Sequence, residues 1–248
     1  MRISLLLAIA LGCHAQQQEF EVASIKPNTT MGSNISINRG PGNGLIATNV
    51  TLRSLITFAY DIRDHQLAGG PAWLDKDRYD IVAKPPSPVA GAPEPTAFPE
   101  VFRLMRMRVQ ALLADRFKLV VHTETREMPV YALVVGKNGP HLAASKSENM
   151  GIHGSTGLLQ CQRLTMKEFA ERALGNRMGR TVLDKTGLTG EYDFEIKYAE
   201  DRGAAAASDV SGPDFLTAMQ EQLGLKLEQQ KGPVPVIVID RAEKAEAN

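Results

Sequence analysis

The chain has 248 residues, of which 43% are hydrophobic and 23% charged, with 28 Lys and Arg against 28 Asp and Glu. This composition is that of an ordinary globular protein and excludes a mainly disordered chain or a collagen-like repeat. Two cysteines are too few for a disulfide-rich miniprotein. A net charge of zero lacks the basic excess typical of nucleic-acid binding, so we expect no nucleic-acid partner.

Residues 1–15 are predicted to be a signal peptide. Arg2 supplies the positive charge, 3–11 form a short apolar run, and small residues precede a cut after Ala15. The apolar run is shorter than the roughly 20 residues that span a bilayer, and no later stretch approaches that length. We therefore expect export to the periplasm or the medium, with no transmembrane segment after cleavage. A cut before Cys13 would instead give a lipid-anchored protein, although the residues before Cys13 fit that pattern less well.

After signal removal Cys161 is the only cysteine, so no disulfide can form within the chain. Cys161 follows an apolar run, which favours a small buried residue over a reactive nucleophile. Packing must therefore provide the stability.

The predicted elements follow from periodicity. Apolar residues alternate in the predicted strands, which are 20–25, 34–37, 45–48, 79–83, 119–122, 130–135, 158–162, 181–183, 192–198, 225–228 and 234–239. A period of 3.6 predicts helices over 52–59, 102–113, 166–174 and 215–223. Stretches rich in Pro, Gly, Ala or polar residues predict linkers at 85–95, 143–149 and 199–212.

Capping residues mark the helix ends. Thr51 is a predicted N-cap, and Thr165 with Glu168 forms a predicted capping box. Pro99 and Pro213 suit the first turn of a helix, and Gly224 suits the left-handed position after its end.

Two segments of the chain echo one another. Residues 45–51, a helix, Leu74-Asp75-Lys76 and Tyr79-Asp80-Ile81 are matched by 158–165, a helix, Leu183-Asp184-Lys185 and Tyr192-Asp193-Phe194. Each copy continues with a linker, a helix and a predicted strand pair, 118–120 with 129–135 and 226–228 with 235–239. The sequence thus predicts an α+β fold built by tandem duplication of a β-α-β-linker-α-β-β unit, with helices packed on mixed or antiparallel sheets. The expected domains are a first unit at 16–142, a linker at 143–150 and a second unit at 151–248. Convergent patterning of amphipathic elements is the alternative.

Three segments carry a family resemblance: Phe20-Glu21-Val22-Ala23-Ser24-Ile25-Lys26-Pro27, the stretch 182–194, and 223–228 with 236–241. They resemble a large uncharacterised family of exported soil-bacterial proteins, of acidobacterial type, which is known only as a domain of unknown function. Some relatives are fused behind a membrane-embedded zinc peptidase of the antibiotic-sensor type. The resemblance implies no catalytic residue.

The second copy is similar, more loosely, to the short N-terminal modules of secretins and TonB-dependent receptors. The shared features are a helix led by Leu164-Thr165, a turn at 187–190 and the step Leu223-Gly224-Leu225 before a closing hairpin. This resemblance implies an envelope module that binds proteins through sheet edges and helix faces.

Direct searches for chemistry give structural interpretations. Asp184-Lys185-Thr186-Gly187 resembles a cation-pump phosphorylation motif but fits a strand end and turn, with Gly187 and Gly190 at positive φ. The histidines after residue 15 show no metal-ligand spacing, so we expect no metal and no cofactor. Gly154-Ser155-Thr156-Gly157 lacks the hydrolase-elbow spacing. Gly40-Pro41-Gly42-Asn43-Gly44 is predicted to be a loop between two strands.

The sequence therefore predicts an exported, non-catalytic interaction module of the cell envelope or the medium. Its partner is expected to be an envelope protein, and the candidate contact residues are Trp73, Tyr79, Tyr192, Arg180 and Asp184. For Trp73, an aromatic plug at one end of the sheet is the stronger alternative. Two other functions remain open: a sensory domain that works with a membrane metallopeptidase, and a secreted hydrolase with dispersed site residues.

Overall fold

The computed structural model describes residues 19–30, 34–87, 98–199 and 213–246. The predicted signal peptide, Cys13 and most of the predicted linkers at 85–95 and 199–212 lie outside these residues. The described residues form two compact units. Unit 1 comprises Met1–Glu124 with Pro235–Asn248, and unit 2 comprises Thr125–Val234.

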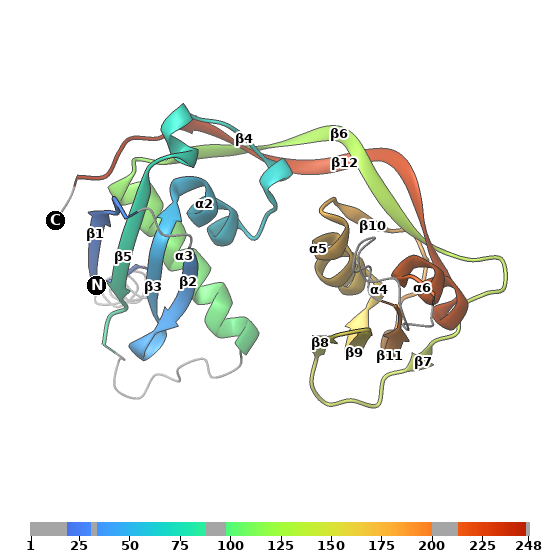
Figure 1. The fold of residues 1–248 in the computed structure, drawn as a ribbon. Helices are drawn as coiled ribbons and strands as arrows, with labels where there is room; N and C mark the ends of the chain where they lie inside the picture. The colour runs from blue at the N-terminus through green and yellow to red at the C-terminus, as the bar shows by residue number, and fades with distance from the viewer. Residues whose placement is uncertain (1–18, 31–33, 88–97, 200–212, 247–248) are drawn as a thin grey trace, which may run out of the picture. The chain divides into compact units, whose positions relative to one another are not determined.

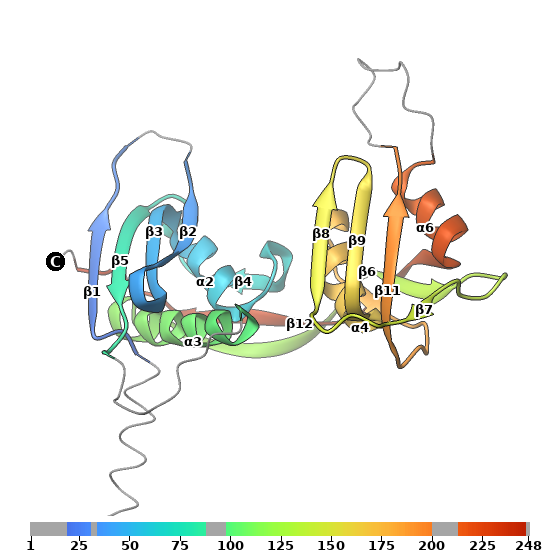
Figure 2. The same cartoon turned by 90° about the horizontal axis from the view of Figure 1, so that it is seen from below.

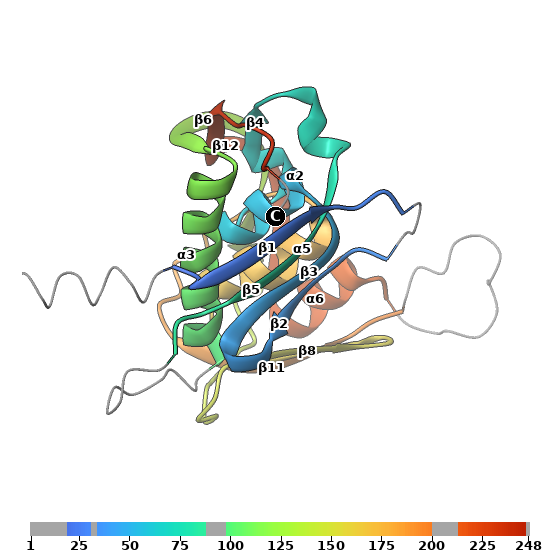
Figure 3. The ribbon, with the colours of Figure 1, turned by 90° about the vertical axis from the view of Figure 1, so that its left-hand side faces the viewer.

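Unit 1 is built on an antiparallel sheet of order β1-β5-β3-β2. Its strands are β1 (Val22–Pro27), β2 (Ser36–Gly40), β3 (Gly44–Thr51) and β5 (Arg78–Lys84). Helices α2 (Leu52–Tyr60) and α3 (Phe98–Arg116) lie on one face of this sheet (Figure 3). Core 1 fills the space between them and includes Ile25, Leu55, Ile81, Leu113 and Phe117. Short 3-10 turns η1 (Pro41–Asn43), η2 (Asp64–Gln66) and η3 (Ala72–Asp75) connect the elements.

Helix α2 begins and ends where its local residues dictate. The Thr51 hydroxyl accepts a hydrogen bond from the backbone N–H of Ser54, which is the predicted N-cap. The helix ends at Asp61, which adopts the left-handed conformation with φ 53°. Its apolar stripe, from Leu52 to Ala59, is buried in core 1. The loop predicted at 40–44 joins β2 to β3, as expected.

Unit 2 contains a second antiparallel sheet, of order β7-β11-β9-β8. Its strands are β7 (Ala143–Ala144), β8 (Gly151–Ser155), β9 (Leu158–Thr165) and β11 (Glu191–Lys197). Core 2 includes Leu133, Cys161, Phe169, Ile196 and Met219. A helix of three consecutive segments packs on the sheet, and these segments are α4 (Met166–Glu168), the π-helical η4 (Phe169–Leu174) and α5 (Gly175–Met178). A second helix, α6 (Phe215–Leu223), follows β11 (Figure 1).

The caps of unit 2 confirm most of the predictions. Thr165 and Glu168 form the predicted capping box, and Gly224 ends α6 with φ 68°. The prediction for Pro213 was wrong. Asp214 is the N-cap of α6 and accepts hydrogen bonds from the N–H groups of Leu216 and Thr217, so Pro213 precedes the helix.

The two predicted closing strand pairs are instead two long single strands. Strand β6 runs unbroken over Val120–Val135 and β12 over Leu225–Arg241. In β6 no glycine interrupts the alternation, so nothing forces a turn. In β12 Gly232 lies inside the strand, and its neighbours approach closely: a Cβ there would lie 2.9 Å from Leu183 Cδ1 and 3.1 Å from Val130 Cγ2. This glycine permits close packing rather than a turn.

These long strands move the domain boundaries away from the predicted linker at 143–150. β6 and β12 are neighbours in a mixed sheet of order β10-β6-β12-β4, with β4 (Leu67–Gly69) and β10 (Val182–Asp184) at its edges. The end of β12 pairs in parallel with β4 inside unit 1, and the end of β6 pairs in parallel with β10 inside unit 2. Each long strand therefore passes from one unit into the other, whereas 143–149 fold as part of unit 2.

The fold class is α+β, as predicted, with mixed and antiparallel sheets. Both units contain a strand, a helix, a short parallel strand, a further strand and a second helix in the same order: β3-α2-β4-β5-α3 and β9-α4/η4/α5-β10-β11-α6. The origin of the two units by duplication stays a prediction. Within the described ranges, no helix is both long enough and apolar enough to cross a membrane.

Candidate functional site: the edge of strand β8

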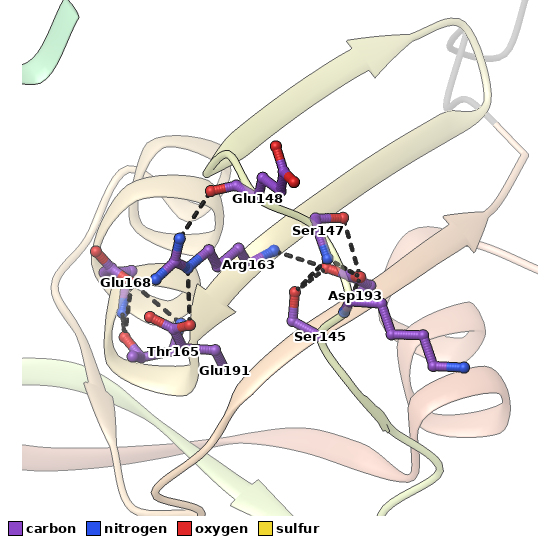
Figure 4. A network of polar contacts seen from close by, with 9 residues as sticks. Ser145, Ser147, Glu148, Arg163, Thr165, Glu168, Glu191 and Asp193 are labelled. Carbon is purple, nitrogen blue, oxygen red and sulfur yellow. Dashed lines mark hydrogen bonds and ion pairs between the residues drawn. The ribbon is translucent and has the colours of Figure 1, made fainter. Parts of the chain in front are cut away.

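Asp193 on β11 is the centre of a polar network in unit 2 (Figure 4). Its carboxylate accepts hydrogen bonds from the hydroxyls of Ser145 and Ser147 at 2.7 and 3.0 Å. It also accepts from the backbone N–H groups of Lys146 at 2.8 Å, Ser147 at 3.2 Å and Arg163 at 2.8 Å. These donors stabilise the charged form and hold the pKa of Asp193 well below its usual range, with Ser145 making the largest contribution.

Arg163 extends the network to the segment that leads into β8. Its Nη1 donates to the carbonyl of Glu148 at 2.7 Å, and its Nε donates to Glu191 Oε2 at 2.9 Å (Figure 4). Asp193 and Arg163 thus hold residues 145–148 against β9 and β11. β8 begins three residues later, at Gly151, and pairs with β9 in an unbroken register.

Unit 1 contains the same arrangement around Asp80. This carboxylate accepts from the backbone N–H of Asn49 and from the side chain of Asn28, each at 2.8 Å. Asn49 and Arg163 both have positive φ, 54° and 50°, and both lie in a bulge where two residues oppose one aspartate. The repeated Tyr-Asp pair therefore supports a β-bulge ahead of the helix in each unit.

Strand β8 is an edge strand of its sheet, next to β9 (Figure 2). Its five residues, Gly-Ile-His-Gly-Ser, include no acidic residue, no Lys or Arg and no proline, and residues 153–155 are exposed. The edge strands of unit 1 differ, because β1 contains Lys26 and Pro27 and β2 contains Arg39. Charge, proline and bulges are the usual protection of an edge against pairing with another strand. β8 lacks all three, since its pairing with β9 shows no register shift.

The direction of the backbone groups at this edge follows from the neighbouring ladder. The Tyr198 N–H donates to the Gly157 carbonyl at 2.9 Å, so the next residue, Leu158, directs its own N–H and C=O away from β11 and toward β8. Ser155 is the register partner of Leu158 and therefore pairs with β9. By alternation, His153 also pairs with β9, and the backbone groups of Ile152 and Gly154 point outward along the edge.

Nothing within unit 2 requires residue 154 to be glycine. Its φ is not positive, and a Cβ built there would have no neighbour within 4 Å. Glycine in a strand costs about 0.5–1 kcal/mol relative to alanine. A glycine in a regular strand commonly marks the close approach of another backbone. Gly154 is thus a feature of the edge and not of the fold.

The predicted contact residues in unit 1 lie against core 1. Tyr79 is 3% exposed and packs edge-to-face on Phe117, with ring centroids 5.2 Å apart. Burial raises its pKa, and the charge of Asp77 adds to this. Trp73 is half-buried against the same core, and the Lys244 ammonium lies 5.8 Å from its ring centroid. Trp73 thus packs on core 1, and its role as a plug at one end of the sheet stays a prediction.

The predicted contact residues in unit 2 lie at three separate places, on β11, on β10 and in the loop between α5 and β10. Tyr192 on β11 packs partly buried on core 2, and Arg180 is exposed after α5. Asp184 ends β10 and accepts hydrogen bonds from the N–H and hydroxyl of Thr186, at 2.9 and 2.7 Å. This is the predicted turn, and Gly187 has φ 71°, whereas Gly190 does not have the expected positive φ. With two residues in unit 1 and three in unit 2, the five do not form a single cluster within either unit.

A depression of about 330 Å³ in unit 2 is lined by Gly136, Lys137, Asn138, Gln220, Gly224 and Lys226. Its ionisable lining residues are Lys137, which follows β6, and Lys226, which lies in β12 and forms an ion pair with Glu228. Across the described ranges, no group of three or more His, Cys, Asp and Glu side chains is placed to hold a metal ion.

The sequence did not predict strand β8, although it contains a signal for it. Thr156-Gly157 directly precedes β9, and a dipeptide ending in glycine before a strand is typical of a hairpin. Strands β4 and β7, each of three residues or fewer, carry too little pattern to be predicted.

Comparison with known proteins gives one family. A family model described as "Protein of unknown function (DUF3738)" matches residues 53–242, which is most of the chain and covers both units. The chain belongs to this family. No curated protein and no solved structure matches the chain. The soil-bacterial origin, the fusion to a membrane peptidase and the similarity to secretin and TonB modules stay predictions.

Proposed function

We propose that this DUF3738 protein is an exported, non-catalytic interaction module that binds an extended segment of a protein partner along β8. The observation that supports this most is the edge itself, which combines outward backbone groups at Ile152 and Gly154 with the absence of charge, proline and bulge. In strand addition, main-chain hydrogen bonds supply the affinity and the neighbouring side chains supply the specificity.

The side chains beside the edge favour an uncharged partner segment. His153 is opposite Gln160 and Gly151 is opposite Gln162 in the register of β8 and β9. On the other face, Ile152 is half-buried against core 2 next to the open position at Gly154. We therefore expect the partner strand to carry an apolar side chain at the position that meets Gly154, and polar neutral side chains on the opposite face.

Export is supported by the sequence at 1–15 and is consistent with the chemistry of the only remaining thiol. Cys161 is 1% exposed, and burial raises its pKa to about 12. A thiol in that state does not form disulfides with other proteins in an oxidising compartment. The module would therefore keep its single cysteine reduced outside the cell.

Selection of peptides from a random phage-displayed library against chain 16–248 tests the interaction. Hydrogen exchange should then show protection of the Ile152 and Gly154 amides by a selected peptide. Gly154→Pro removes an outward N–H, leaves the β9 ladder intact and should abolish binding. The matched control is Arg39→Pro on β2, where the N–H also points outward by the same alternation, and it should leave binding unchanged. Protection elsewhere, or full affinity in Gly154→Pro with a native circular dichroism spectrum, would refute the proposed function.

A further inference from the structure

The residues of β8 are complementary to themselves in an antiparallel pair. With His153 at the two-fold axis, Ile152 of one copy lies opposite Gly154 of the other, and Gly151 lies opposite Ser155. Each directly opposite pair shares a face of the sheet. A large side chain thus meets a glycine twice, and no charged residue faces a like charge.

The hydrogen-bonding groups fit the same axis. Ile152 and Gly154 carry the outward N–H and C=O groups, and they are the two residues that the two-fold axis exchanges. They would form two hydrogen-bonded pairs, Ile152 with Gly154 and Gly154 with Ile152 of the second copy. His153 then falls in the non-hydrogen-bonded pair between them, where opposite side chains lie closest. A register slipped by one residue, with the axis between two residues, would place outward groups opposite inward ones.

The pairing of two β8 strands also explains why residue 154 is glycine. The space above its Cα, which is empty within unit 2, is the space that Ile152 of the second copy would fill. In return, the half-buried Ile152 would become covered by the backbone of the other chain.

We propose that the partner strand at β8 is the β8 strand of a second copy, so that two unit 2 sheets join in one continuous antiparallel sheet. This rests on the proposed function, since it names the occupant of the same edge. An isologous contact of this kind closes on itself and stops at a dimer. The pair of short strands buries little surface, so the dimer is weak and forms at high protein concentration.

Charge substitution at the axis tests the proposal, because residue 153 faces its own copy. His153→Asp and His153→Lys each place two like charges opposite one another and should each weaken dimerisation about tenfold or more. An equimolar mixture of the two variants places Asp opposite Lys and should restore association. Sedimentation velocity over a concentration series measures all three samples. The matched controls, Asn38→Asp and Asn38→Lys on β2, should dimerise like the native chain.

The outcomes separate this inference from the proposed function. A native chain that stays monomeric at the highest concentration, or two His153 variants whose mixture associates no better than either alone, would overturn the second copy as occupant. In that case a peptide that binds the native chain and not Gly154→Pro would still support β8 as a docking edge. Dimerisation that persists in Gly154→Pro would place the dimer contact elsewhere and refute the inference.

Discussion

Because β6 and β12 pass through both units, we expect the units to unfold together. Leu133 of β6 and Leu225 of β12 are buried in core 2, while Val121 of β6 and Ile239 of β12 pack on core 1. If core 2 melts, both strands lose half of their support. A substitution in core 2 should therefore destabilise core 1 as well.

Phe169→Ala is the perturbation that measures this coupling. Phe169 is fully buried in core 2 and packs edge-to-face on Phe194, with ring centroids 4.9 Å apart. Truncation of such a ring costs about 3–5 kcal/mol. With a slope of about 3 kcal/mol per molar urea for a chain of this size, the midpoint should fall by about 1–2 M.

Trp73 makes the assay specific, since it is the only tryptophan and lies in unit 1. Its fluorescence in a urea titration reports core 1, and far-ultraviolet circular dichroism reports both units. In Phe169→Ala, both signals should shift together by the full amount. Leu216→Ala is the control, because that side chain is 43% exposed on α6 and should move neither midpoint. A Trp73 midpoint that stays native while circular dichroism shows two transitions would refute the coupling.

Three further predictions concern single groups. Iodoacetamide should modify Cys161 only after unfolding, because burial raises its pKa to about 12, and rapid labelling of the native chain by mass spectrometry would contradict this. His122 lies between Asp240 and Glu124, and the hydrogen bonds that its protonated ring donates to these carboxylates raise its pKa above 6.5. Its stabilising effect is therefore present below about pH 6.5 and is lost as the pH rises through the raised value. The urea midpoints of His122→Gln and of the native chain should differ at pH 6 and converge at pH 9. Gly224→Ala should lower the free energy of unfolding by more than the roughly 1–2 kcal/mol that a left-handed alanine costs, because its Cβ would overlap the Gly139 carbonyl. Gly179→Ala is the control, since a Cβ there has open space and should cost only the left-handed conformation. Equal losses of stability in thermal unfolding of the two variants would argue against the clash.

Local signals predicted the helices well. The residues that cap α2, α4 and α6 act on backbone groups within one turn, so the sequence next to each helix contains the information. Thr51 and Thr165 illustrate this, since both accept the expected hydrogen bond. The apolar stripes were equally informative because they face a core on one side only.

Long-range pairing was less predictable. The segments 119–122 and 130–135 each show their own apolar alternation, so the sequence predicted two paired strands with a turn between them. The local sequence does not specify the strand with which each segment pairs. Gly232 had the same ambiguity, and only its contact with Val130 and Leu183 distinguishes close packing from a turn. The domain boundaries depended on these strands and were displaced for the same reason.

Residues that are repeated in both units, such as the Tyr-Asp pairs, are poor indicators of function. The tyrosines of the repeated Tyr-Asp pairs, Tyr79 and Tyr192, were predicted as contacts, yet Tyr79 is buried, and the aspartates beside them, Asp80 and Asp193, hold equivalent bulges. Structural needs common to both units produce such repeats. The corresponding edge strands, β2 and β8, differ instead: β2 carries Arg39, and β8 is uncharged with a glycine that its own unit does not need. Because β2 and β8 are both edge strands of four-stranded antiparallel sheets, folding places the same requirements on each. The difference between them is therefore better explained by a partner at β8 than by folding.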